Sequence, residues 1–227
     1  MDRTSVRLLN FFAEYVTDHK KVLVEKVLSQ RTRHLTLVLE DIYQPQNASA
    51  VVRTCEGFGL QDLHVIEGRH HYELNPRVVH GASKWIDIIK YSGRPNNTAT
   101  CYNHLREKDY TILATSPESN GLSIYDVDVK DKIALVFGTE KYGITDYAKQ
   151  HADGLVTIPM YGFTESYNIS VSAAICTSIL AQKLFTSDVK WELSNDEKLK
   201  LKLEWYRKVV HRSEILEKEF LKSLDED

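Results

Sequence analysis

The stretch TLVLEDIYQPQNASAVVRTCEGFGL, residues 36–60, holds one complete strand-to-helix unit. Its first five residues form a short, mostly apolar run, which predicts a buried strand. A polar loop then leads through Asn47 into a segment with helical periodicity that ends at Gly57 or Gly59. Polar side chains therefore gather where a strand ends and a helix begins, which is where a parallel α/β sheet places its chemistry.

The same alternation of strands and helices continues along the chain. Polar turns separate the units, most clearly around Gln61, at 93–97 and at 116–121. Alternating strands and helices are typical of βαβ units, so the fold class is α/β with a mostly parallel sheet. No complete GxGxxG motif follows any strand, which disfavours a Rossmann-type methyltransferase or dehydrogenase. The further strands are predicted at LHVI (63–66), WIDII (85–89), TILAT (111–115), KIALVFG (132–138) and GLVTIP (154–159).

Both ends of the chain are predicted to be helical. Residues 3–30 carry apolar positions at helical spacing, with Asp18 available as a cap between two helices, and residues 194–227 return to pure helix. We therefore expect three parts: an N-terminal helical extension at 1–33, a main α/β domain at 34–186 and a C-terminal helical extension at 187–227.

Composition limits the class of protein. A chain of 227 residues, 42% hydrophobic and 27% charged, is ordinary for a soluble globular protein with one main domain. No apolar run approaches the length of a membrane span, so we expect a cytoplasmic protein. Cys55, Cys101 and Cys176 form no CxxC pair and no His/Cys cluster, which indicates neither a disulfide framework nor a zinc site.

Charge is distributed unevenly. The net charge of −3 argues against a general electrostatic grip on nucleic acid. Residues 1–33, however, hold seven Lys and Arg against four Asp and Glu, and residues 198–212 hold six against one. These basic windows in the two extensions are candidates for contact with an RNA backbone, although the helix at 194–227 can equally carry them on a solvated face.

Two further loops carry polar residues beside glycine or proline. LVFGTEKYG, residues 135–143, ends an apolar strand, and its Glu140 can bond to Asn47 or Arg53 or can cap the helix that starts near Thr145. IPMYGFTESYNISVSAA, residues 158–174, closes a strand and leads into a helix rich in small residues. Its Asn168 can cap that helix, as Asn47 can cap the earlier one, and a catalytic role does not conflict with capping.

In this order, NASAVVRTCEGFG (47–59), LVFGTEKYG and IPMYGFTESYNISVSAA resemble the three signature motifs of the SpoU/TrmH family of SPOUT RNA 2'-O-methyltransferases. The resemblance covers about residues 35–185, and GASKWIDI (81–88) brings the chain closest to the tRNA (guanosine-2'-O-)-methyltransferase subgroup. It implies a C-terminal trefoil knot, a homodimer whose partner chain completes the site, and bound S-adenosyl-L-methionine. The implied activity is 2'-O-methylation of guanosine 18 in the D loop of tRNA.

The resemblance also assigns roles to residues. Helical spacing alone does not put Arg53 on the same face as Asn47, so its long side chain would have to reach back toward the loop. We expect it to fix a phosphate and to stabilise the developing alkoxide, because guanidinium stays protonated; the group that takes the hydroxyl proton is left open. Tyr167 stands where the family usually has leucine, which matters little if the contact is made by backbone. The implied reaction centre is Asn47, Arg53, Glu140, Ser166 and Asn168, and the implied cofactor contacts are Thr115, Gly138, Ile158, Met160 and Tyr167.

Two alternatives remain beside the tRNA hypothesis. The residues of the centre act on ribose and cofactor rather than on base identity, so the same chemistry on ribosomal or another RNA fits them too. A non-catalytic RNA-binding protein of the same fold is the other alternative, and the joint presence of all five centre residues speaks against it. No membrane and no metal is expected in any of these cases.

Overall fold

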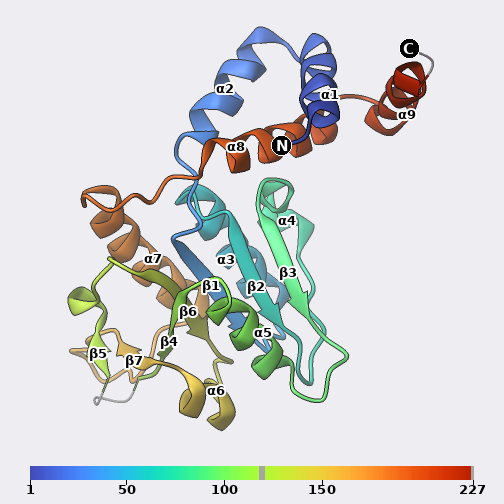
Figure 1. Cartoon of the computed structure of the whole chain (residues 1–227). Helices are drawn as coiled ribbons and strands as arrows, with labels where there is room; N and C mark the ends of the chain where they lie inside the picture. The colour runs from blue at the N-terminus through green and yellow to red at the C-terminus, as the bar shows by residue number, and fades with distance from the viewer. Residues whose placement is uncertain (118–120, 226–227) are drawn as a thin grey trace. The chain divides into compact units, whose positions relative to one another are not determined.

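The computed structural model of the chain describes residues 1–117 and 121–225 (Figure 1). Part of the turn predicted at 116–121 and the end of the helix predicted at 194–227 therefore lie outside the described residues. The chain forms two compact units. One is residues 32–191, and the other combines residues 1–31 with residues 192–227.

The larger unit is built on one parallel sheet of seven strands, which confirms the predicted fold class. The strand order is β3-β2-β1-β6-β4-β7-β5, and every pair is parallel. Strands β1 and β2 are buried along their whole length, as is typical of parallel strands covered on both faces. The strands are β1 (Leu35–Glu40), β2 (Asp62–Ile66), β3 (Asp87–Tyr91), β4 (Tyr110–Thr115), β5 (Leu122–Ser123), β6 (Lys132–Phe137) and β7 (Gly154–Thr157).

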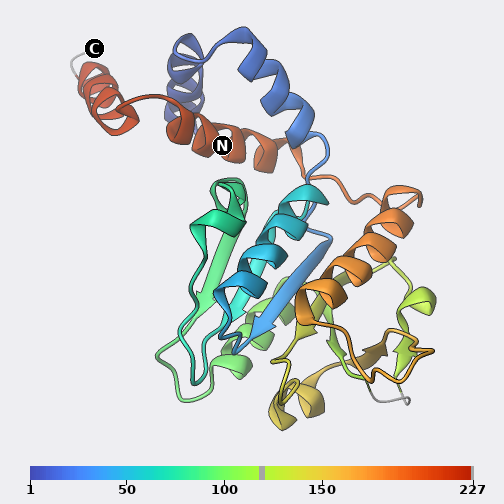
Figure 2. The same ribbon diagram turned by 180° about the vertical axis from the view of Figure 1, so that it is seen from behind.

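Helices cover both faces of this sheet. On one face, Leu37 and Leu39 of β1 share a core with α3 and α7, which lie side by side in Figure 2. On the other face, Val38 packs with α5 and α6. Alternate residues of β1 thus enter opposite cores, as the pleat requires. The helices of this unit are α3 (Pro45–Gly57), α4 (Pro76–Val79), α5 (Asn97–Arg106), α6 (Asp146–His151) and α7 (Ile169–Phe185), with 3-10 turns η1 (Ala82–Lys84) and η2 (Ile124–Asp126).

Most predicted strands are confirmed, with two differences. The run WIDII is only partly strand, because η1 and its capping residue Trp85 precede β3, which begins at Asp87. The two-residue strand β5 was missed, since so short an edge strand leaves no alternating pattern to read. After β7 the chain returns to place α7 against α3 and β1, which is consistent with the predicted trefoil knot.

The smaller unit consists of four helices from the two ends of the chain. Phe12, Trp205 and Tyr206 are buried in it, and the rings of Phe11 and Phe220 stack 4.7 Å apart. The hydroxyl of Thr17, not Asp18, caps the second helix, so the predicted cap is off by one residue. The predicted C-terminal helix is two helices with a break at 210–212, where Arg212 has a φ of 54°. The four are α1 (Arg3–Glu14), α2 (Asp18–Leu28), α8 (Asn195–Val209) and α9 (Ser213–Asp225).

Across the described residues, no helix combines the length and the apolar character that crossing a membrane requires.

Candidate active site

The strand order places a crevice between β1 and β6. The helix after β1, α3, packs on one face of the sheet, whereas the helix after β6, α6, packs on the other. At such a topological switch point the loops leaving neighbouring strands diverge, and open α/β proteins bind their ligands there. The three polar loops singled out in the sequence all lie along this C-terminal edge of the sheet (Figure 1).

Three of the five predicted centre residues meet at this edge. Asn47 donates from Nδ2 to Oε1 of Glu140 at 2.9 Å, and Asn168 donates from Nδ2 to the same oxygen. Asn168 Nδ2 also lies 3.2 Å from Oδ1 of Asn47. Two amides from different helices therefore hold one carboxylate oxygen. Among the described residues, the polar contacts of the Glu140 carboxylate all go to Oε1, which leaves Oε2 to accept a hydrogen bond from a ligand.

Asn47 is committed to this cluster and does not cap its helix. α3 begins at Pro45, and Gln44 occupies the capping position without a side-chain cap bond, so the capping interpretation of Asn47 is wrong. Asn47 lies in the first turn, is 8% exposed, and also donates to Oε1 of Gln44 at 2.6 Å. Sequence reasoning missed Gln44. The signal available was its place in the polar loop directly after the strand TLVLE.

Asn168 caps its helix, as predicted, and also belongs to the cluster. Its Oδ1 accepts from the backbone N–H of Ser170 at 2.9 Å and so caps α7, while its Nδ2 joins Asn47 and Glu140. The cap satisfies one of the free N–H groups at the start of a helix. Because α7 begins at this cluster and packs on α3, any shift of α7 would move the amide that holds Glu140.

The loop that carries Glu140 is a tight hairpin of backbone. Thr139 and Gly143 exchange both backbone hydrogen bonds at 2.9 Å. A Cβ on Gly138 would lie 2.1 Å from the carbonyl carbon of Gly143, a distance that no real side chain adopts. Glycine is therefore required here so that the loop can close on its own backbone, and the predicted contact of Gly138 with the cofactor stays a prediction. Gly143 adopts a φ of 67°, in the left-handed region.

Buried Glu40 anchors the far end of the same loop. It is 2% exposed at the end of β1, where Oε2 accepts from the backbone N–H of Thr145 at 2.8 Å and Oε1 accepts from the hydroxyls of Thr145 and Thr98. Thr145 itself caps α6. Capping of α6 therefore falls to Thr145 and Glu40, and Glu140 takes the other option open to it in the sequence, the bond to Asn47.

The remaining two predicted centre residues stand apart from this cluster. Arg53 is exposed on α3 and donates to the carbonyl oxygen of Val78 at 3.4 Å, so it does not reach back toward the loop. Ser166 is exposed in the loop before α7. Their roles stay predictions, and both side chains are accessible to a second molecule.

The predicted cofactor residues come from three adjacent strands. Thr115 ends β4, Gly138 follows β6, and Ile158 and Met160 follow β7, and these strands are neighbours in the order β6-β4-β7. The hydroxyl of Thr115 donates to the carbonyl of Val136 at 2.8 Å, so a cofactor contact at this residue would have to use the main chain. Ile158 and Met160 are half-buried and offer apolar surface, and Tyr167 is 42% exposed. The contacts of these residues with a cofactor stay predictions.

One large pKa shift in the unit lies inside the sheet. Burial lowers the pKa of His64 on β2 to about 3, helped by the nearby charges of His104 and Lys108. Its Nδ1 shares a hydrogen bond of 2.8 Å with the Tyr91 hydroxyl, which in turn lies 2.7 Å from Nδ1 of His104. Within the described part of the chain, no group of His, Cys, Asp and Glu side chains is arranged to hold a metal ion.

Comparison with known proteins identifies the family. The SpoU rRNA Methylase family matches residues 34–178, which include all three polar loops. The chain belongs to the SpoU rRNA methylase family. A tRNA (guanosine(18)-2'-O)-methyltransferase of Borreliella burgdorferi is 42% identical over 217 residues, which are 96% of this chain and 98% of that protein. The protein of the same description from Thermus thermophilus is 31% identical over 159 residues, 70% of this chain and 80% of its own length.

Solved structures agree on the fold. The TrmH/SpoU tRNA modifying enzyme of A. aeolicus superposes with a TM-score of 0.76 at 24% identity, and covers 86% of this chain and 98% of its own. A SpoU methyltransferase of Streptomyces viridochromogenes, solved in complex with the cofactor AdoMet, gives a TM-score of 0.60 at 18% identity over 71% of this chain and 65% of its own. The fold expected from the three motifs is therefore confirmed.

Proposed function

We propose that this chain uses S-adenosyl-L-methionine to methylate the 2'-hydroxyl of guanosine 18 in tRNA. The observation that carries the proposal is the cluster at the switch point. There the amides of Asn47 and Asn168, from two helices, both donate to one carboxylate oxygen of Glu140, from a loop. The Borreliella burgdorferi relative, which matches 96% of this chain, supports the choice of tRNA and of this guanosine. The terminal helices lie within the region that the Borreliella protein shares.

The cofactor supplies a methyl group bonded to a positively charged sulfur, which makes its carbon an acceptor for an oxygen nucleophile. The residues of the chain must bring the ribose 2'-oxygen in line with that carbon. Orientation of this kind lowers the barrier by removing the entropy of a bimolecular encounter. With the cofactor bound, the 2'-oxygen would take the methyl group, S-adenosylhomocysteine would be the leaving group, and the hydroxyl proton would pass to solvent or to a neighbouring group.

The Asn47–Glu140–Asn168 cluster is suited to hold the ribose. With Oε1 held by two amides, the carboxylate of Glu140 has a fixed orientation, and Oε2 accepts a hydrogen bond from a ribose hydroxyl. Arg53, on the same helix as Asn47, is proposed to hold the neighbouring phosphate and to stabilise the charge that develops on the 2'-oxygen. Its exposed position is compatible with a site that a second chain completes.

We propose a homodimer on the evidence of exposed aromatic side chains. Tyr161 and Phe163, in the loop before α7, are 97% and 108% exposed, and Val171 and Phe185 of α7 are also exposed. Apolar side chains gathered in one segment are typical of an interface between subunits. Sedimentation of the purified protein is expected to give a dimer, and a monomer at micromolar concentration would contradict this part of the proposal.

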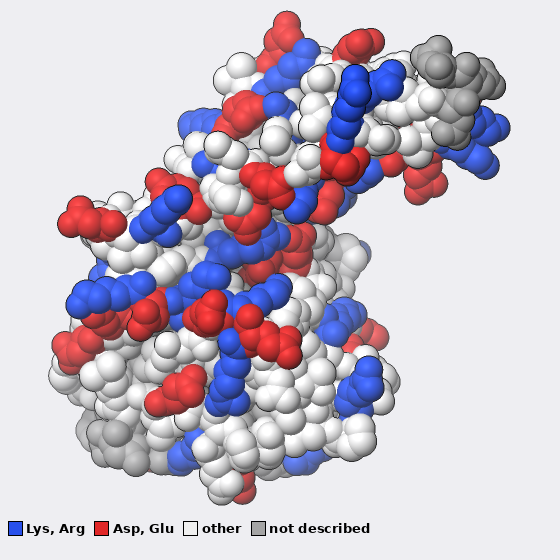
Figure 3. Space-filling view, viewed as in Figure 1, with Lys and Arg blue, Asp and Glu red and all other residues white. Residues whose placement is uncertain are grey.

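Charge alone does not select the RNA. On the face drawn in Figure 3, Lys and Arg are interspersed with Asp and Glu, and no area of one sign dominates. The basic windows of the terminal segments, α1, α2 and α8 among them, are the proposed contacts with the tRNA backbone. Cytoplasmic location is part of the same proposal, because tRNA is the substrate.

The test is transfer of labelled methyl from S-adenosyl-L-methionine to unmodified tRNA and to ribosomal RNA, with the product nucleotide mapped. Methyl on guanosine 18 of tRNA is the expected result. Label confined to ribosomal RNA would show that ribosomal RNA is the substrate. Ribosomal RNA is the second candidate, because the family's description names it. No label in either RNA, with RNA still bound, would favour a non-catalytic binder.

A further inference from the structure

A cavity of about 470 Å³ opens at the switch point, beside the catalytic cluster but made of other residues. We call it the switch-point pocket. Its volume lies in the range of small-molecule sites. It is formed by the segments that follow β1 and β2 and by the loop between β6 and α6, and its lining includes Asp41, Tyr43, Arg69, His70, Lys141 and Tyr142.

The lining combines aromatic rings with cations. On one side, the rings of Tyr43 and His70 lie 5.3 Å apart. On the other side, the ring of Tyr142 is 67% exposed, with Lys141 Nζ 5.0 Å and the Arg69 guanidinium 5.8 Å from its centroid. Exposed rings beside Arg and Lys are the usual means by which proteins hold unpaired nucleotides, since every base has a π face and every nucleotide a phosphate.

Internal hydrogen bonds brace both sides of the pocket. Asp41, held at a φ of 57°, accepts from the backbone N–H groups of Gly68 at 3.2 Å and His70 at 2.9 Å, which ties the segment after β2 to the end of β1. The opposite side is the hairpin closed by Thr139 and Gly143. The pocket is therefore formed before any ligand arrives, which lowers the entropy lost on binding.

Hydrogen bonds connect the pocket to the Asn47–Glu140–Asn168 cluster. Gln44 donates from Nε2 to the Tyr43 hydroxyl at 3.1 Å and accepts from Asn47 at its Oε1. On the other side, Lys141 directly follows Glu140 in the chain. A ligand in the pocket thus touches the two segments that fix the reaction centre.

We propose that the switch-point pocket binds an unstacked nucleobase of the substrate RNA, together with its backbone phosphate, while the ribose to be methylated lies at the Asn47–Glu140–Asn168 cluster. The proposal rests on the proposed function, since it assumes an RNA substrate. A phosphate alone fits less well, because Asp41 and Asp146 also face the cavity and would repel it. The cofactor fits less well because, of the segments that hold its predicted residues, only the loop after β6 lines this pocket, whereas the segments after β4 and β7 do not.

Substitution of exposed residues tests the pocket. Tyr142→Ala and Arg69→Ala are expected to raise the KM for tRNA about tenfold each, which is the scale of one lost base stack, with kcat and the Kd for S-adenosyl-L-methionine unchanged. Tyr142→Phe is expected to restore the wild-type KM, because stacking needs the ring and not the hydroxyl. Tyr125→Ala is the matched control, since Tyr125 is 57% exposed on η2 and does not line the pocket.

Binding of fluorescent tRNA in the presence of S-adenosylhomocysteine separates this proposal from the proposed function. Weakened tRNA binding by Tyr142→Ala supports the pocket even if the wild-type protein transfers no methyl, which would defeat only the proposed function. Unchanged tRNA binding and KM in an active enzyme would overturn the pocket proposal alone. A raised Kd for S-adenosyl-L-methionine with unchanged tRNA binding would also overturn it, because the pocket would then belong to the cofactor.

Discussion

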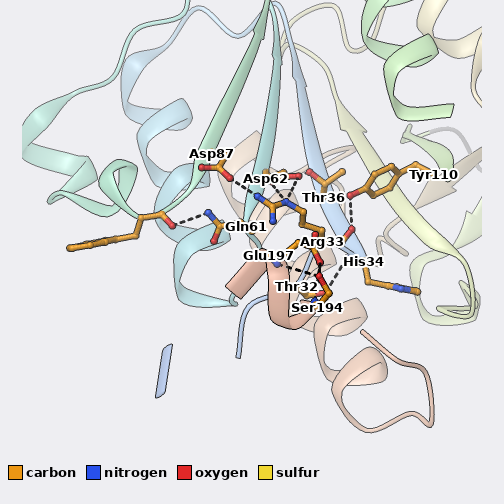
Figure 4. A network of polar contacts seen from close by, with 11 residues as sticks. Thr32, Arg33, His34, Thr36, Gln61, Asp62, Asp87, Tyr110, Ser194 and Glu197 are labelled. Atoms are coloured by element: carbon orange, nitrogen blue, oxygen red, sulfur yellow. Dashed lines mark hydrogen bonds and ion pairs between the residues drawn. The ribbon is translucent and has the colours of Figure 1, made fainter. Parts of the chain in front are cut away.

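The two edges of the same sheet use charged residues in opposite ways. At the N-terminal edge, Arg33 donates from Nε to Asp62 at 3.0 Å and from NH2 to Asp87 at 2.7 Å, and the Tyr110 hydroxyl donates to its backbone carbonyl (Figure 4). The Asp62 side chain is only 5% exposed. These groups satisfy one another between β1, β2, β3 and β4, so the network joins strands and offers little to a ligand.

At the C-terminal edge, internal hydrogen bonds hold the polar groups in place, and the side chains of Glu140 and Asn168 still face solvent. Glu140 is fixed by two amides through one oxygen, and its side chain remains exposed. Tyr142 is exposed as well. The C-terminal edge uses internal hydrogen bonds to position its polar groups and exposes them to solvent. At the N-terminal edge the charged groups bond to one another. Substitutions at the C-terminal edge should therefore lower activity, and substitutions at the N-terminal edge should lower stability.

The largest effect is expected from Arg53→Ala. Methyl transfer should fall by about 100-fold or more, because a charge that stabilises the transition state is removed, while cofactor affinity and the melting temperature stay nearly unchanged. Steady-state kinetics, calorimetric titration of S-adenosyl-L-methionine and thermal unfolding check the three parts. Arg77→Ala, an exposed arginine on α4, is the control. Full activity of Arg53→Ala would refute the assigned centre.

A substitution in the hairpin tests how far the active edge depends on its backbone. Gly138→Ala places a Cβ 2.1 Å from the carbonyl carbon of Gly143, so the loop must open. Cofactor affinity is expected to fall at least about tenfold, measured by calorimetric titration. Gly57→Ala at the end of α3 meets nothing within 4 Å and should bind the cofactor like the wild-type protein. Equal affinities for both variants would show that the loop does not contribute to the cofactor site.

A substitution at the N-terminal edge is expected to lower the stability of the protein. Asp62→Ala removes the buried partner of Arg33, whose guanidinium keeps its bond to Asp87, so the loss of a charged hydrogen bond should cost about 2 kcal/mol of unfolding free energy. The folded protein should keep its kcat. Urea titration measures both variants, and Asp128→Ala, which removes an exposed ion pair with Lys130, should leave the unfolding free energy nearly unchanged. Loss of kcat in folded Asp62→Ala would break the contrast between the edges.

The interior between the edges should set the acid stability. Burial lowers the pKa of His64 from 6.5 to about 3, so the unfolded chain takes up a proton between these values that the folded chain does not. Stability therefore falls as the pH falls from about 6.5, with a slope of up to about 1.4 kcal/mol per pH unit. Urea titrations at pH 7, 6 and 5 measure it. His64→Asn, which keeps a hydrogen-bonding group near Tyr91, should flatten the slope, and an unchanged slope would exclude His64 as its source.

The sequence predicts the larger unit well because its strands are short apolar runs bounded by glycine and polar turns. The sharing of Glu140 by Asn47 and Asn168 was only half predicted. The bond from Asn47 was one of two options, and the bond from Asn168 depends on α7 returning to pack on α3, which no local pattern encodes. The break at 210–212 was missed for a similar reason, since Arg212 adopts a left-handed conformation that sequence reserves for glycine or asparagine.

The switch-point pocket could not be predicted either. Its two sides come from segments about 70 residues apart in the chain, 69–70 and 139–146, and they meet only because β2, β1 and β6 are adjacent in the sheet. The polar residues of the C-terminal edge were visible in the sequence as strand-end loops. The strand order decides which of these residues contact one another, and the sequence does not show the strand order.

The central claim is that the C-terminal edge methylates a ribose hydroxyl of tRNA. The most direct measurement is a single-turnover reaction with labelled S-adenosyl-L-methionine and two synthetic tRNAs, identical except that guanosine 18 of one lacks its 2'-hydroxyl. The account predicts stoichiometric labelling of the unmodified tRNA and none of the 2'-deoxy tRNA. Equal labelling of both tRNAs would contradict it, because the methyl group would then be going to another atom or another nucleotide.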